Sequence, residues 1–261
     1  MTEQEWLVSA DPENMLRFLI PLTPRRGRLF SCACCRSMWH LLSDMGKTAL
    51  KIAEQYADGQ ATLKDLLAFT LRGPRQYSQP TLDDVMTVNL HYYVAYNIDL
   101  NAVMGTVDAP YYNVDTSVFF VGTPSENVSE GPVSRPDWAC ANAIRETLFP
   151  QQDFAVYEFV GRAVLRACGD VPAMLRTQCG ILRDIFGNPF RRVTFDPQWL
   201  TFTVLALAQT MYDSRDFSAM PILADALQDA GCDSDDVLAH CRSAGPHVRG
   251  CWVIDLLLGL K

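Results

Sequence analysis

The chain has 261 residues, of which 49% are hydrophobic and 20% are charged, and its formal net charge is −8. This length is enough to bury a sizeable core in one large domain or two small ones, and the composition is that of an ordinary globular protein. The negative charge argues against a protein that holds a nucleic-acid backbone, because such a protein presents a basic face.

Neither an export signal nor a membrane-spanning segment is visible. The first residues, MTEQEWLVSADPE, are acidic and lack the basic start and apolar stretch of a signal peptide. No run reaches the roughly 18 to 20 apolar residues that a helix needs to cross a bilayer. We therefore expect a cytoplasmic protein without membrane association, in which thiols stay reduced. The odd number of cysteines, nine, also excludes a complete framework of intramolecular disulfides.

Helix signals are dense in the first seventy residues. Asp11 is the expected N-cap of one helix, with Pro12 at its first helical position. Thr62 and Asp65 have the spacing of a capping box and indicate the start of another. Between them the apolar spacing predicts two further helices, over residues 28–42 and 45–56.

The middle of the chain, residues 73–135, is rich in tyrosine and proline. From 86 to 100, in MTVNLHYYVAYNIDL, every even position is apolar, which is the two-residue period of a half-buried strand. The same residues also allow an apolar helical stripe. YYNVDTSVFFV (111–121) is β-branched and aromatic, as strands are, and residues 122–136 have the composition of an exposed, mobile loop. We expect an insertion here, either a small β structure or an irregular one.

The tyrosines of this insertion are the predicted contact surface for a protein partner. Tyrosine supplies a large contact area at a low entropic cost, which favours it at interfaces. The residues that we expect to bind the partner are Tyr92, Tyr93, Tyr96, Tyr111 and Tyr112.

Helical periodicity returns from Pro136 and continues to the end of the chain. Gly187 and Gly231 follow apolar repeats of three to four residues and are expected to end helices. A short helix capped by Asp233 or Ser234 comes next, and HVRGCWVIDLLLG closes the chain as a buried strand or helix. The predicted fold class is mainly α, a multi-helix single globular domain over residues 1–261.

Two blocks of sequence carry a resemblance to a known family. One is RLFSCACCRSMWHLL (28–42) with AEQYADG behind it, and the other runs from LRDIFGNPF to LAHCRSAGPHVRGCWVIDLLLG. Over about residues 1–60 and 180–261 the chain resembles a large paralogous family of uncharacterised planctomycete bacterial proteins. The resemblance implies no activity. Members of that family carry Ala-rich helical sequence in the middle, which favours helix for residues 82–100.

The block at 28–42 holds three cysteines and one histidine in a segment that is apolar nearly all round. A helix of this kind is buried, and unpaired cysteines act in it as small hydrophobic residues. Arg36 would then need a buried carboxylate as its partner. The acidic residues that lie in apolar runs and could serve are Asp184, Asp225 and Asp255.

A zinc site is the alternative interpretation of the cysteines and histidines. The C-terminal part of the chain contains Cys232, His240, Cys241, His247 and Cys251, which are residue types that zinc prefers. No C-x2-C pair is present, although it is the strong signature of structural zinc. The ligand set that we predict combines both ends of the chain and consists of Cys32, His40, Cys241 and His247.

The sequence therefore favours a non-enzymatic helical interaction or scaffold module that binds a protein partner and needs no cofactor. The alternatives are a zinc-stabilised module and a metal- or thiol-dependent enzyme, with Cys35–His40 or Cys241–His247 as conceivable thiol pairs. All of them share one structural expectation. The apolar block at 28–42 should pack against residues 237–258, because neither segment can face water.

Overall fold

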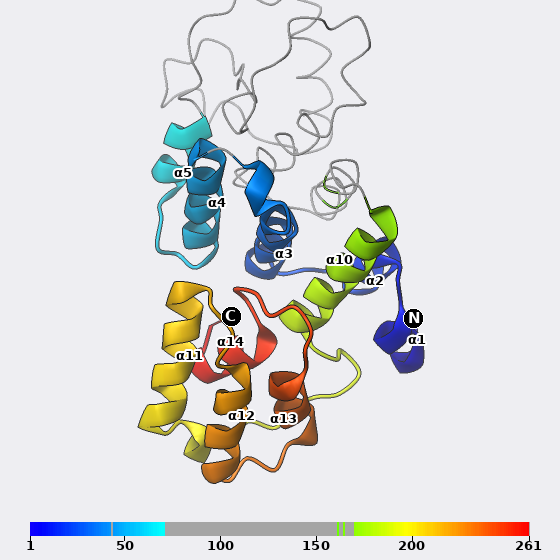
Figure 1. Ribbon diagram of the computed structural model, residues 1–261, viewed down its shortest axis with the longest axis vertical. Coiled ribbons are helices and arrows are strands. Elements are labelled where there is room, and N and C mark those ends of the chain that lie inside the picture. Colours follow the sequence, from blue (N-terminus) through cyan, green and yellow to red (C-terminus); the bar gives the residue numbers. More distant parts are fainter. Residues whose placement is uncertain (43, 71–160, 162–163, 165–169, 261) are drawn as a thin grey trace, which may run out of the picture.

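The computed structural model describes residues 1–42, 44–70, 161, 164 and 170–260 (Figure 1). These residues form ten α-helices and two short 3-10 helices, and no strand occurs among them, so the predicted mainly α fold class is confirmed. None of the helices in these ranges has both the length and the apolar character needed to cross a membrane. The predicted insertion at 73–135, its loop at 122–136 and the five candidate partner-binding tyrosines lie outside the described residues.

The N-terminal part is a group of short helices with well-defined caps. Asp11 accepts a hydrogen bond from the backbone N–H of Asn14, and Thr62 and Asp65 bond reciprocally, so both predicted caps are confirmed. The elements are α1 (Glu3–Val8), α2 (Pro12–Phe18), α3 (Pro24–Arg36), η1 (Trp39–Leu41), α4 (Asp44–Ala57) and α5 (Leu63–Thr70).

Helix α3 begins and ends earlier than the sequence predicts. Pro24 occupies its first turn, where proline's fixed φ suits a helix. After Arg36 the chain turns, the Ser37 hydroxyl donates to the Cys34 carbonyl at 2.6 Å, and the Arg36 guanidinium lies 4.5 Å from the centre of the Trp39 ring. The expected single helix over 28–42 is therefore wrong from Ser37 onward. His40 lies in η1 and is exposed.

The expectation that this block is core is confirmed. The three cysteines of α3 are buried together with Leu29 and Phe30. They form a first hydrophobic core with α2, α4 and the long helix α10 (Val171–Phe186). Burial of free thiols among aliphatic side chains explains the cysteines as packing residues.

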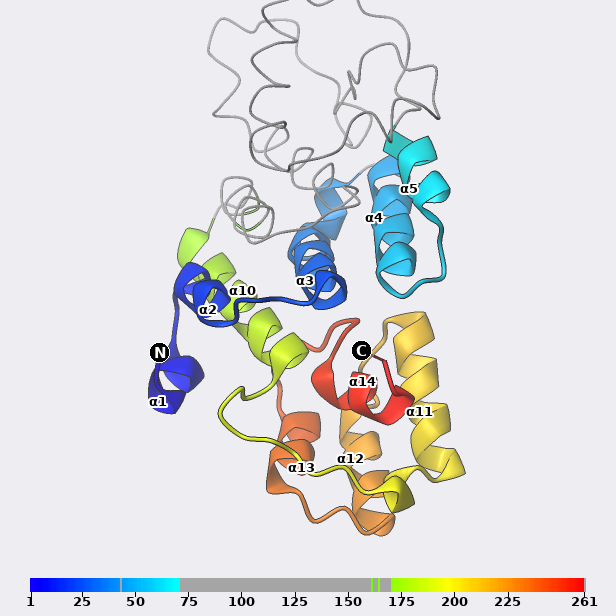
Figure 2. The ribbon, with the colours of Figure 1, turned by 180° about the vertical axis from the view of Figure 1, so that it is seen from behind.

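A second hydrophobic core is formed by the C-terminal helices. Its elements are η3 (Pro197–Trp199), α11 (Phe202–Ser214), α12 (Met220–Asp229), α13 (Asp235–Arg242) and α14 (Trp252–Leu258). They gather at the end of the molecule opposite α5, and α10 runs toward them from the N-terminal helices in both views (Figure 2). The two cores are thus distinct and meet along an interface.

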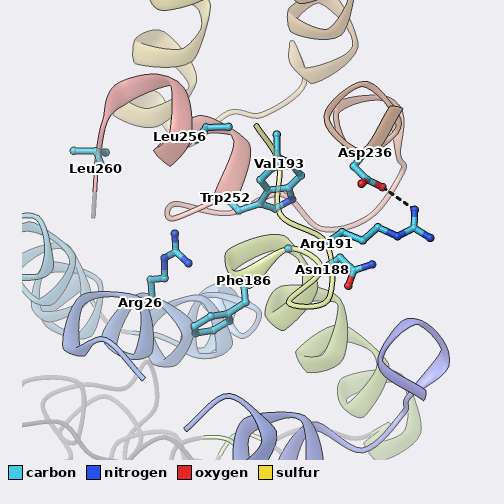
Figure 3. Close-up of a pocket in the computed structure, with 10 residues that line it drawn as sticks. Arg26, Phe186, Asn188, Arg191, Val193, Asp236, Trp252, Leu256 and Leu260 are labelled. Carbon is cyan, nitrogen blue, oxygen red and sulfur yellow. Dashed lines mark hydrogen bonds and ion pairs between the residues drawn. The ribbon is translucent and has the colours of Figure 1, made fainter. Parts of the chain in front are cut away.

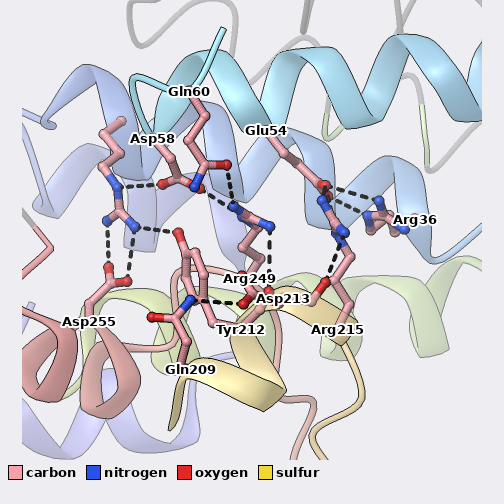
Figure 4. A network of polar contacts seen from close by, with 11 residues as sticks. Arg36, Glu54, Asp58, Gln60, Gln209, Tyr212, Asp213, Arg215, Arg249 and Asp255 are labelled. Carbon is pink, nitrogen blue, oxygen red and sulfur yellow. Dashed lines mark hydrogen bonds and ion pairs between the residues drawn. The ribbon is translucent and has the colours of Figure 1, made fainter. Parts of the chain in front are cut away.

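A seam of buried ions crosses that interface (Figure 4). Asp58, at the end of α4, accepts from Arg25 Nε at 2.9 Å and from Arg249 Nε at 2.7 Å. Arg25 also donates two hydrogen bonds to Asp255 of α14, at 2.5 and 2.9 Å, and one to the Tyr212 hydroxyl at 2.8 Å. The carboxylates of Asp58 and Asp255 are 2% and 0% exposed, so each depends on its guanidinium partners.

Glu54 extends the seam by one further carboxylate. It accepts from Arg36 of α3 and from Arg215, which follows α11. The partner of Arg36 is therefore Glu54, and the expectation that Asp184, Asp225 or Asp255 would serve is wrong. Glu54 lies on the adjacent helix α4, where it reaches Arg36 more directly than any of those three residues. Asp225 is exposed and pairs with Arg242.

The expected contact between the block at 28–42 and the C-terminal segment is confirmed at Leu29. A Cβ atom on Gly250 would lie 2.9 Å from Leu29 Cδ1, so the backbone there rests directly on α3. Gly250 also has φ +95°, a conformation that other residues adopt only with strain. Both constraints require glycine at this position.

Replacing Asp58 should weaken the attachment between the two halves of the molecule, which are the helices around the first core and the helices around the second core. In an Asp58→Asn chain two buried guanidinium groups lose their shared carboxylate, and we expect a loss of about 3 kcal/mol in the free energy of unfolding. Urea unfolding followed by circular dichroism measures it. The matched control is Asp225→Asn. The Asp225 side chain is 74% exposed, so this substitution should lower the free energy of unfolding by less than about 1 kcal/mol. Equal effects of the two substitutions would contradict a seam that holds the halves together.

Candidate metal centre

Four potential metal ligands converge where α10 meets the C-terminal helices. Asp184 comes from the last turn of α10, His240 from α13, His247 from the following loop, and Cys251 is the N-cap of α14. One ligand atom from each residue lies within 4.8 Å of all the others. In the ranges that the structure describes, this is the one group of three or more such residues.

Close backbone packing brings the loop onto α10. A Cβ atom on Gly180 would lie 2.8 Å from Pro246 Cγ, so the loop before His247 touches the helix at a position without a side chain. One turn further along α10, Asp184 accepts the backbone N–H of Val248 at 2.8 Å through Oδ2. These contacts fix the loop and leave the Oδ1 atom of Asp184 for the histidines.

The distances between ligand atoms are short. Asp184 Oδ1 lies 2.8 Å from His247 Nδ1 and 3.1 Å from His240 Nε2, and His240 Nε2 lies 3.2 Å from Cys251 Sγ. Zinc bonds of about 2.0–2.3 Å in a tetrahedron separate the ligand atoms by roughly 3.3–3.8 Å. The ligand atoms of the remaining pairs are at most 4.8 Å apart, so small adjustments of these side chains would bring all four atoms to zinc-bonding distance.

Both ring nitrogens of His247 face oxygen acceptors. Nδ1 faces Asp184, and Nε2 lies 3.3 Å from the carbonyl oxygen of Ser243. A neutral imidazole has a single N–H and can satisfy only one of these acceptors. The arrangement is complete only with an added positive charge, which is either a proton on the ring or a cation beside Nδ1.

Burial and the neighbouring groups shift the pKa values in this cluster. Burial alone would raise the pKa of Asp184, but the hydrogen bonds from His240 and His247 outweigh it and lower that pKa. Burial would likewise lower the pKa of His247, but its hydrogen bond to Asp184 raises it. Burial, with the nearby charge of Asp184, raises the pKa of the Cys251 thiol well above its usual range.

The cluster is closed to solvent. The side chains of Asp184, His247 and His240 are 2%, 8% and 15% exposed, and Cys251 is fully buried. The His240 ring packs against His247 at 5.0 Å and against Trp252 at 5.2 Å between ring centres. Such neighbours hold the orientation of a ligand ring, as outer residues do in metal sites.

Only one of the four ligands predicted from the sequence belongs to this group. His247 does, whereas Cys32 is buried in the first core and His40 is exposed on η1. Cys241 follows His240 directly, but neighbours on a helix point about 100° apart, and its side chain lies in the second core. The structure does not bring the predicted set together.

The sequence shows three of the four residues of this group. His240, His247 and Cys251 were all in the recognised C-terminal cluster, with the spacing H-x6-H-x3-C. The sequence predicts Asp184 only as a possible partner of Arg36. Nothing in the sequence marks a carboxylate on another helix as the fourth ligand of this cluster.

Comparison with family models, with curated proteins and with solved structures finds no match for this chain. The resemblance to the planctomycete family accordingly stays a prediction. The interpretation of the site rests on its geometry.

The buried thiols are poorly suited to nucleophilic catalysis. Burial raises the pKa of Cys241 to about 12 and that of Cys179 to about 11. All seven cysteines among the described residues are free and buried. A nucleophilic cysteine needs instead a lowered pKa and access to its substrate.

Thiol reactivity tests this conclusion. In a Cys140→Ser/Cys168→Ser chain, which retains only the seven described thiols, we expect Ellman's reagent at pH 8 to react at least about 100-fold more slowly with native than with urea-unfolded protein, because a thiol of pKa about 12 is hardly ionised at that pH. The control is the same titration in urea, where all seven should react. One thiol that reacts rapidly in the native protein would restore the thiol-enzyme hypothesis.

Proposed function

We propose that this chain is a non-enzymatic, zinc-stabilised helical module. The observation that carries the proposal is the convergence of Asp184, His240, His247 and Cys251 from α10, α13, the loop and α14. Zinc accepts nitrogen, sulfur and carboxylate ligands in a tetrahedron, and these four residues supply all three types. The site would fasten α10, which belongs to the first core, to the second core.

Two features favour zinc over a harder cation. Calcium and magnesium take oxygen ligands, whereas this group offers two imidazoles and one thiol. The positive charge that His247 requires beside Nδ1 is also supplied by the ion, with the Nε2–H donating to Ser243 and so fixing the tautomer. A bound divalent cation would favour the Cys251 thiolate, which burial otherwise disfavours.

A structural role fits the site better than a catalytic one. Structural zinc sites are closed and use four protein ligands, while catalytic sites keep one position open for water or substrate. The four side chains here supply the four ligand atoms that a closed site needs, and none of them is more than 15% exposed. The ion would therefore stabilise the fold rather than perform chemistry.

Metal analysis of the full chain, purified without a tag or chelator, tests the proposal. We expect about one zinc per chain by elemental mass spectrometry, and its loss in His240→Ala and Cys251→Ser variants. At a free zinc concentration of 100 times Kd, the ion should stabilise the protein by about 2.7 kcal/mol and raise its Tm by several degrees. Cobalt exchanged for zinc should show thiolate charge-transfer absorption that Cys251→Ser abolishes.

The ligands predicted from the sequence provide matched controls. His40→Gln and Cys241→Ser change the same residue types outside the observed group, so both variants should keep the metal. Metal loss in these variants, with retention in His240→Ala, would place the ion elsewhere. Absence of zinc from every preparation, together with no change of Tm on adding it, would refute the proposal and leave a protonated His247 as the counter-charge of Asp184.

The zinc-stabilised module would bind a protein partner through its tyrosine-rich insertion, residues 73–135. This part of the proposal comes from the sequence, since the tyrosines lie outside the described residues. Deleting residues 105–134 should leave the zinc content and thermal unfolding unchanged and abolish capture of the partner. Affinity capture with the full and the shortened chain, followed by mass spectrometry, measures the difference. A shortened chain that still retains the partner would contradict this role of the insertion.

A further inference from the structure

A pocket of about 230 Å³ is lined by Trp252, whose ring also packs on His240, but by none of the four residues of the candidate metal centre (Figure 3). It is formed where α3, the end of α10 and α14 meet. Its apolar walls are Phe186, Val193, Trp252, Leu256 and Leu260. Its polar lining comes from Arg26, Asn188, Arg191 and Asp236. The walls belong to both cores, so the pocket exists only when the two halves are joined.

Arg26 brings an uncompensated positive charge to this pocket. It extends from α3 toward α14, with its guanidinium between Phe186 and Leu260 (Figure 3). No described residue accepts a hydrogen bond from it, and the first turn of α3 contains no acidic residue. A half-buried guanidinium has five N–H donors, and leaving them unsatisfied against an apolar wall is unfavourable.

The other charges around the pocket are neutralised by one another. Arg191 donates to Glu3 at 2.5 Å and to Asp236 at 3.2 Å. Asp255 is the acidic residue whose charge reaches Arg26, but both of its oxygens already accept from Arg25. Arg26 is consequently the one cation lining the pocket that has no carboxylate bound to it among the described residues.

We propose that this pocket binds a small organic carboxylate with an aromatic or branched apolar body. The carboxylate would accept a bidentate pair of hydrogen bonds from Arg26, the geometry that a guanidinium favours. The apolar body would pack on the rings of Trp252 and Phe186. The volume is smaller than that of most drug-sized sites, which limits the ligand to about the size of a phenylpropionate.

Calorimetry with three matched probes tests the proposal on the full chain. The probes are 3-phenylpropionate, the uncharged 3-phenylpropionamide and the cationic 3-phenylpropylamine, which share the ring and differ in the head group. We expect the carboxylate to bind about 10- to 100-fold more tightly than the amide, because a charge-assisted hydrogen bond is lost in the amide, and the amine not to bind. Quenching of tryptophan fluorescence provides a second readout, since Trp252 lines the pocket.

An Arg26→Gln variant separates the head-group contact from general hydrophobic binding. It should bind the carboxylate and the amide equally, while Arg192→Gln, an exposed arginine that does not line the pocket, should bind as the unmodified chain does. Thermal unfolding of both variants establishes that each is folded. Equal binding of carboxylate and amide by the unmodified chain, unchanged carboxylate binding in Arg26→Gln, or no carboxylate binding at millimolar concentration would each overturn the proposal.

Discussion

The position of the two halves depends on the buried seam in which Asp58 is shared by Arg25 and Arg249. Each carboxylate of the seam is buried, and each has at least one guanidinium partner from a different part of the chain. Removing such ions from water costs about as much as their attraction returns, so pairs of this kind add little net stability. They do make misalignment costly, because sliding one half over the other would leave ions buried and unpaired. Apolar side chains alone tolerate such sliding far better. The seam therefore specifies how the two cores meet, while the cores themselves supply most of the stability.

One short stretch around the start of α14 contributes residues to the seam, to the candidate metal centre and to the pocket. Arg249 donates to Asp58 in the seam, and Cys251 belongs to the candidate metal centre. Trp252 packs on His240 and also lines the pocket. One turn later, Asp255 accepts from Arg25 in the seam. Residues three to four apart share one face of a helix, whereas adjacent residues diverge. This periodicity lets the helix face the seam with one side and the pocket with another, so a displacement of α14 would disturb all three features together.

Local features of the fold could be predicted from the sequence, and long-range partners could not. The cap at Asp11 was predicted, and that of α13 was predicted as Asp233 or Ser234, because a helix N-terminus depends on a side chain within three residues of its first N–H groups. The structure has Ser234 as the cap of α13. The burial of α3 was also predictable, since its apolar residues surround the helix. The pairing of Arg36 with Glu54 was missed because several carboxylates were equally plausible and only the packing of α3 on α4 decides between them. Asp184 was missed as a ligand for the same reason, since the docking of α10 brings it to the histidines.

The candidate metal centre has the same electrostatic requirement as the seam. Asp184 is a buried carboxylate that requires a positive counterpart from the C-terminal half, as Asp58 does. In the seam the counterpart is a guanidinium, which remains charged at any physiological pH. Here the partners of Asp184 are His240 and His247, and the second nitrogen of His247 already faces the carbonyl of Ser243. A proton would satisfy this demand with one bond to Asp184. A zinc ion would satisfy it while also engaging His240 and Cys251, whose Sγ lies 3.2 Å from His240 Nε2, the distance of a hydrogen bond between a thiol and an imidazole. The two alternatives therefore differ in reach, since the ion would draw on all four residues of the group, whereas the proton joins only His247 to Asp184.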